Sequence, residues 1–115
     1  MKKIALFVFN PDPLCFIHVL LNALDMDRRN FEVRVVIEGA ATKLVPELAK
    51  KDNPLHQMWE KAKNYGLVDG VCKACSAKMG TQEAAEEQNL ALLDDMSGHP
   101  SMAQYQEDGC EVMIF

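Results

Sequence analysis

Apolar and polar positions follow two alternating patterns along the chain. An almost unbroken apolar run, typical of a strand covered on both faces, occupies 3–9 (KIALFVF). A second predicted strand, 31–38 (FEVRVVIE), is rich in β-branched residues, and shorter strands are predicted over 67–72 and 110–115. Between these runs, apolar residues recur every three or four positions, as on one face of a helix. Strands that alternate with helices predict right-handed crossovers and a parallel sheet with helices on both faces. We therefore predict a single α/β domain over 1–115, in three layers around a mostly parallel sheet of four to five strands.

The first helix is the longest one predicted, over 13–26. Asp12 is placed to cap its first turn, directly before a proline that suits the first helical position. The apolar spacing predicts that Ile17 and Leu21 face the core.

The apolar pattern after Thr81 predicts two further helices, separated by a break. Thr81 is placed to cap a longer helix that presents Leu90 and Leu93 to the sheet. A break follows at 97–100, where we interpret His99 beside Pro100 as a helix start, and the last predicted helix covers 102–108.

Composition and charge narrow the classes of partner. Twelve basic residues stand against seventeen acidic ones, a formal net charge of −5, which disfavours a nucleic-acid partner. The longest uninterrupted apolar run, Ile4–Phe9, falls far short of the roughly 20 residues that span a bilayer, so no membrane association is expected. We expect a cytoplasmic protein, in which its four cysteines stay reduced and serve metal or redox chemistry rather than disulfides.

The predicted sheet distributes the four cysteines unequally. Parallel sheets bind ligands outside the carboxyl ends of their strands. Cys72 and Cys75 follow the third predicted strand and Cys15 follows the first, so all three are expected at that edge. Cys110 begins the last strand at the opposite edge, and we predict that it is a core residue.

The position of Cys72 predicts a reactive thiol. A cysteine at a helix N-terminus faces unpaired N–H groups, which lower the thiol pKa from about 8.5. A thiolate placed in this way attacks a disulfide or a sulfane sulfur. We predict that Cys72 and Cys75 carry the chemistry and that Cys15 lies near the substrate pocket.

The sequence is also compatible with chemistries other than a reactive thiol at Cys72. A thioredoxin fold would place the Cys-x-x-Cys pair after an early strand, whereas here the pair follows the third predicted strand. A non-catalytic zinc module using Cys15, His18, Cys72 and Cys75 is the main alternative, and a subunit whose cysteines only pack is another. No cofactor is otherwise expected, because the loop after the first strand lacks the glycines of a phosphate cradle.

The segment from Gly70 to Gly80 carries a family resemblance. A strand that ends in Cys72, a short alanine-rich helix and a glycine eight positions later resemble the DsrE/DsrF-like family, which includes the TusD-type sulfur-relay subunits. The closing segment 109–115 also looks like the family's final strand, and the order of elements agrees over nearly the whole chain.

The resemblance implies both a fold and a function. The implied fold has three α/β/α layers, similar to flavodoxin, and members often assemble as trimers or hexamers. The implied activity is sulfur transfer from a donor to an acceptor protein through a persulfide at Cys72. Cys75 departs from the sulfur-relay subunits, which carry a small residue there. It is either a resolving thiol or the mark of a branch with a different task.

Overall fold

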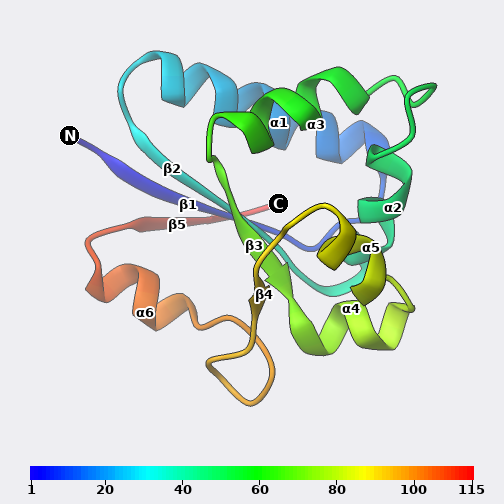
Figure 1. Cartoon of the computed structure of the whole chain (residues 1–115). Helices are drawn as coiled ribbons and strands as arrows, with labels where there is room; N and C mark the ends of the chain where they lie inside the picture. The colour runs from blue at the N-terminus through cyan, green and yellow to red at the C-terminus, as the bar shows by residue number, and fades with distance from the viewer.

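The computed structural model describes all of residues 1–115 and contains one five-stranded sheet (Figure 1). Its strand order is β4-β3-β2-β1-β5, and every neighbouring pair is parallel. The strands are β1 (Lys3–Val8), β2 (Glu32–Ile37), β3 (Val68–Cys72), β4 (Leu92–Leu93) and β5 (Glu111–Ile114). The predicted α/β architecture is thereby confirmed, with five strands in the sheet.

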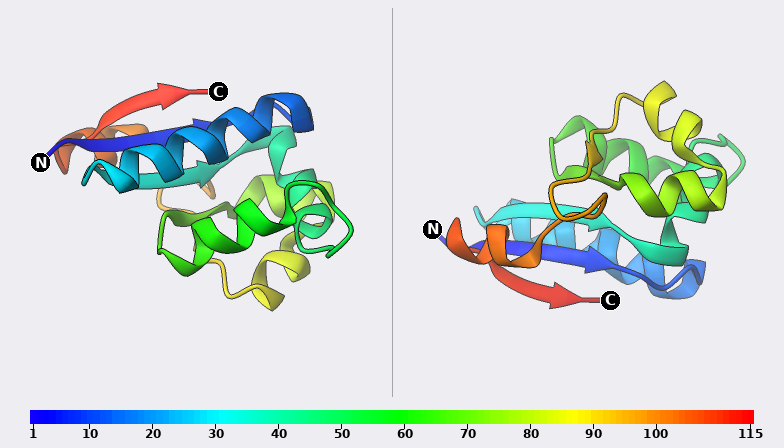
Figure 2. Two further views of the ribbon diagram at one scale, coloured as in Figure 1. Left: turned by 90° about the horizontal axis from the view of Figure 1, so that it is seen from above. Right: turned by 90° about the horizontal axis from the view of Figure 1, so that it is seen from below.

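Helices cover both faces of the sheet. The helical elements are α1 (Pro13–Arg28), the 3₁₀ helix η1 (Gly39–Lys43), α2 (Leu44–Leu48), α3 (His56–Asn64), α4 (Lys73–Met79), α5 (Gln82–Glu87) and α6 (Met102–Glu107). Figures 1 and 2 show α1 and α3 on one face and α6 on the opposite face. None of these helices has the length and apolar composition that crossing a membrane requires.

The buried side chains of β1 divide between two core clusters. Ile4, Leu6 and Val8 point into the larger cluster, which includes residues of α1 and α3. Ala5 and Phe7 point the other way, where the Phe7 ring meets the edge of Tyr105 from α6 at 5.4 Å between centroids. Successive strand residues face opposite sides, so an unbroken apolar run supplies both layers of the core.

The predicted long helix after Thr81 is wrong in its second half. Helix α5 ends at Glu87, and Asn89 adopts a left-handed backbone with φ of 60°. Leu92 and Leu93 then pair with Val71 and Cys72 as the edge strand β4. The open edge of β3 offers backbone hydrogen bonds that a helical continuation would leave unmade, and apolar spacing alone does not reveal this.

The predicted inner face of α1 is also partly wrong. Leu21 is 47% exposed, whereas Phe16, Val19 and Leu20 are completely buried. Two neighbouring apolar stripes run along this helix, and the sheet selects the one containing the large aromatic side chain.

Candidate functional site

The site begins where β2 and β3 end side by side. In their parallel register Ile37 lies opposite Val71, so the next residues, Glu38 and Cys72, leave the sheet at the same edge. Glu38 retains a backbone hydrogen bond to Val8 of β1 and is buried, with 6% of its surface exposed. The sheet therefore brings a carboxylate and a thiol together.

Cys72 is both the last residue of β3 and the N-cap of α4. Its sulfur accepts a hydrogen bond from the backbone N–H of Cys75 at 3.4 Å, in the place of the usual capping oxygen. The side chain of Cys72 is completely buried, while Cys75 is half-buried. The capping geometry turns both thiols toward the same side of the helix start.

A tight turn after β4 brings His99 to the two cysteines. Met96 and His99 exchange backbone hydrogen bonds around Ser97 and Gly98, both of which have positive φ. The carbonyl of Gly98 accepts from the N–H of Ala74, which fixes the turn over the start of α4. This turn also covers Cys72, whose thiol donates to the same carbonyl at 3.8 Å.

The imidazole of His99 lies at the centre of the group. Its Nδ1 is 3.1 Å from the Sγ of Cys72, 3.6 Å from the Sγ of Cys75 and 3.8 Å from Oε1 of Glu38. One donor atom from each residue lies within 4.8 Å of all the others. We call Glu38, Cys72, Cys75 and His99 the thiol cluster.

Burial governs the protonation of the thiol cluster. It raises the pKa of the Cys72 thiol to about 12, although the N–H of Cys75 acts in the opposite direction. Burial also raises the pKa of the Glu38 carboxyl, opposed by its hydrogen bond with Cys72 and by His99. The predicted lowering of the Cys72 pKa is wrong, because the seven-residue α4 offers little dipole and desolvation dominates.

Comparisons with known proteins bear on the family and the fold of the chain. The sequence model of the DsrE/DsrF-like family matches residues 3–115. The chain belongs to this family. Similar proteins include the uncharacterized protein MJ0733 of Methanocaldococcus jannaschii, 27% identical over 96% of this chain and 93% of that protein. An uncharacterized protein of Archaeoglobus fulgidus is 42% identical over 36% of this chain and 67% of its own length.

A solved structure resembles the whole fold of this DsrE/DsrF-like chain. It is a conserved protein of unknown function, BT1422, from Bacteroides thetaiotaomicron, with a TM-score of 0.72 and 14% identity. The match covers 99% of this chain and 95% of that one. The predicted family resemblance and three-layer fold are both confirmed.

The remaining predicted site residues lie outside the thiol cluster. Cys15 is half-buried in the first turn of α1, and His18 is exposed one turn further on. Neither contributes to the cluster, so the structure does not assemble the zinc set of Cys15, His18, Cys72 and Cys75 that the sequence left open as an alternative. Cys110 is buried beside Ala5 in the smaller core cluster, as predicted.

Two members of the thiol cluster were missed from the sequence. His99 does not start a helix: α6 begins at Met102, after Ser101 as its cap, and His99 belongs to the turn over the cysteines. In the sequence, Glu38 is only the polar residue that ends a predicted strand, so it was not identified as a site residue. Its signal is its place directly after β2, since a polar residue at the carboxyl end of a central strand reaches the ligand-binding edge.

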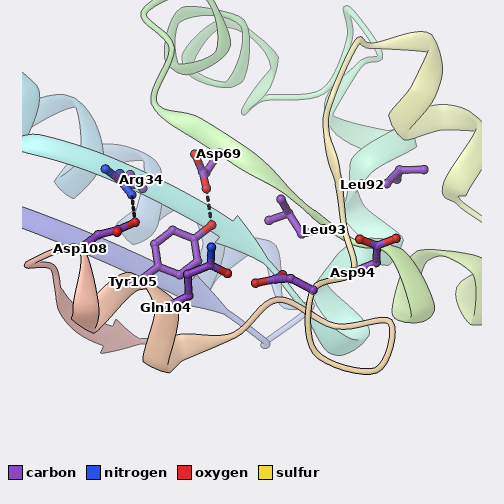
Figure 3. A pocket seen from close by; sticks show the side chains of 9 residues that line it. Arg34, Asp69, Leu92, Leu93, Asp94, Gln104, Tyr105 and Asp108 are labelled. Atoms are coloured by element: carbon purple, nitrogen blue, oxygen red, sulfur yellow. Dashed lines mark hydrogen bonds and ion pairs between the residues drawn. The ribbon is translucent and has the colours of Figure 1, made fainter.

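A second feature of this DsrE/DsrF-like chain is a charged cavity of about 290 Å³ against α6 (Figure 3). Its lining residues are Arg34, Asp69, Leu92, Leu93, Asp94, Asp95, Gln104, Tyr105 and Asp108. The phenol of Tyr105 donates to the carboxylate of Asp69, and Arg34 pairs with Asp108 (Figure 3). The cavity contains no cysteine, so it is distinct from the thiol cluster.

The pair of Tyr105 and Asp69 predicts a loss of stability at alkaline pH. Burial first, and then the Asp69 carboxylate, raise the pKa of Tyr105 far above its ordinary value of about 10. As the pH rises, the unfolded chain therefore releases the phenol proton of Tyr105 at a lower pH than the folded chain does. Tyr105 contributes its full share to the free energy of unfolding below a pH of about 10. Above that pH, the free energy of unfolding falls by up to about 1.4 kcal/mol per pH unit.

The variant Tyr65→Phe isolates this effect, because the chain has two tyrosines and Tyr65 is exposed. Tyrosinate absorbance in this variant is expected to appear only together with the loss of far-UV ellipticity. Tyrosinate formed near pH 10 in a chain with intact ellipticity would contradict the prediction.

Proposed function

We propose that this protein is a sulfur carrier, in which Cys72 accepts sulfane sulfur as a persulfide and passes it to a partner protein. The observation that carries the proposal is the pair of thiols that share Nδ1 of His99, at 3.1 Å and 3.6 Å. Membership of the DsrE/DsrF-like family supports the sulfur-relay class. A buried thiol needs a base within reach to become a nucleophile, and His99 is that base.

Sulfur loading begins with proton transfer from the Sγ of Cys72 to Nδ1 of His99. The thiolate is held by the N–H of Cys75, and it attacks the terminal sulfur of a donor persulfide. A new S–S bond forms on Cys72 while the donor's S–S bond breaks. The donor leaves as a thiolate and takes the proton from His99. An acceptor thiolate then repeats the exchange in the reverse sense, so that no net oxidation occurs.

Cys75 is the resolving thiol in this proposal. Its Sγ lies within 4.8 Å of the Sγ of Cys72. When no acceptor arrives, the Cys75 thiolate attacks the Sγ of the Cys72 persulfide, which forms a disulfide and releases hydrosulfide. A dithiol or thiol reductant is then needed to restore the two cysteines.

The partners in this proposal are proteins that present a cysteine persulfide or an acceptor cysteine. The complete burial of Cys72 means that the Met96–His99 turn has to yield before a partner sulfur reaches it. Assembly as a homotrimer or homohexamer belongs to the same proposal, with family membership as its support.

Mass spectrometry of the reduced, metal-free protein after incubation with a persulfide donor tests the proposal. Wild type is expected to gain one sulfur atom on Cys72 at early times, located by peptide mapping, and then to form the Cys72–Cys75 disulfide because no acceptor is present. Cys72→Ser is expected to gain none, and Cys75→Ser is expected to keep the persulfide without forming the internal disulfide. Cys15→Ser is the matched control, since Cys15 is also half-buried but lies outside the thiol cluster. The proposal fails if neither wild type nor Cys75→Ser gains sulfur on Cys72, or if Cys72→Ser still gains it.

A further inference from the structure

The four donor atoms of the thiol cluster have the spacing of a metal site. In a tetrahedral zinc site, bond lengths of about 2.0–2.3 Å place the donor atoms roughly 3.3–3.8 Å apart. The three distances from Nδ1 of His99, to the two sulfurs and to Oε1 of Glu38, are 3.1, 3.6 and 3.8 Å. The other pairs lie within 4.8 Å, so a small inward movement of side chains completes the tetrahedron.

We propose that Glu38, Cys72, Cys75 and His99 form a binding site for one divalent cation of borderline-soft character, with Zn²⁺ as the best match. Two thiolates and one imidazole select zinc over magnesium or calcium, which prefer oxygen ligands. A single carboxylate oxygen as the fourth ligand closes the coordination shell without water.

The surroundings of the thiol cluster favour a bound cation. Glu38 and Cys72 are buried with 6% and 0% of their surfaces exposed, and a buried anionic group is costly unless a positive charge accompanies it. Cys75 and His99 are only half-buried, which gives an ion a route to the two buried ligands. Binding forms four metal–ligand bonds and releases the protons of both thiols to solvent, with no change in oxidation state.

This ligand set differs from the one that the sequence suggested. Glu38 and His99 take the places of Cys15 and His18, which lie outside the cluster. The inference uses the residues of the proposed sulfur site but does not depend on sulfur transfer. Because zinc would occupy the same two sulfurs, it adds regulation to that proposal: the zinc-loaded protein cannot accept sulfane sulfur.

The test is a titration of the reduced, metal-free full chain with Zn²⁺ in competition with a chromophoric chelator, with no sulfur donor present. One ion per chain is expected. Substituting a residue that only supports a metal ligand commonly weakens metal binding about 10- to 100-fold. Glu38→Gln and His99→Gln change direct ligands, so each is expected to weaken zinc binding roughly 100-fold or more. Cys15→Ser and His18→Gln are the matched controls and are expected to bind as wild type does.

Cobalt substitution of the wild type gives a second measurement that needs no variant. Co²⁺ is expected to show the intense visible bands of a tetrahedral site and thiolate-to-metal charge transfer from two cysteines. Absence of a stoichiometric ion, an octahedral cobalt spectrum, or equal weakening by Cys15→Ser and His99→Gln would each overturn the inference. Sulfur loading is measured separately on metal-free protein, so failure of one proposal leaves the other standing.

Discussion

Replacing His99 with glutamine is expected to slow the sulfur loading of Cys72 by about 10²- to 10⁴-fold, the range that a positioned general base contributes. Burial raises the pKa of the Cys72 thiol to about 12, so very little thiolate exists near neutral pH without a proton acceptor. Nδ1 of His99, at 3.1 Å from the Sγ of Cys72, is within reach to accept this proton. Time-resolved mass spectrometry of metal-free protein with a persulfide donor measures the rate.

The control for this experiment is His18→Gln, because His18 is exposed on α1 and has no part in the thiol cluster. Its rate is expected to equal that of wild type. Far-UV circular dichroism of both variants checks that the fold is retained. Equal loading rates in His99→Gln and His18→Gln would show that His99 is not the base.

The largest expected effect on stability comes from Trp59→Ala in α3. Trp59 is completely buried, its ring meets the edge of Phe16 at 6.1 Å between centroids, and its Nε1 donates to Gln88 at 2.8 Å. Removing it leaves a cavity between α1 and α3 and an unmade hydrogen bond. We expect a loss of about 3–5 kcal/mol in the free energy of unfolding, a large share of the roughly 5–15 kcal/mol typical of a domain.

Urea denaturation measures this loss directly. Thermal unfolding should follow it with a fall in Tm of roughly 12 °C or more, at about 4 °C per kcal/mol for a chain of this size. Tyr65→Ala is the matched control, since it also removes a large aromatic side chain, but one that is 55% exposed. A loss in Trp59→Ala no larger than in Tyr65→Ala would contradict the placement of Trp59 at the centre of the core.

The order of every strand except β4, and the position of the two central thiols, could be predicted from the sequence alone. The nearly unbroken apolar run of β1 reflects burial on both faces, and β2 is rich in β-branched residues, so local composition reveals both strands. Cys72 and Cys75 lie three positions apart at the boundary of β3 and α4, so their proximity is a local property of the chain. The family motif falls on this same local segment.

Contacts between distant segments determine which other groups join these thiols and how the thiols ionise. Glu38 and His99 stand 34 and 27 positions from Cys72 and reach it through the register of β2, β3 and β4. Strand pairing between distant segments, rather than local periodicity, sets that register. Helix position predicted a lowered pKa for Cys72, whereas complete burial raises it, because desolvation depends on every element packed around the sulfur.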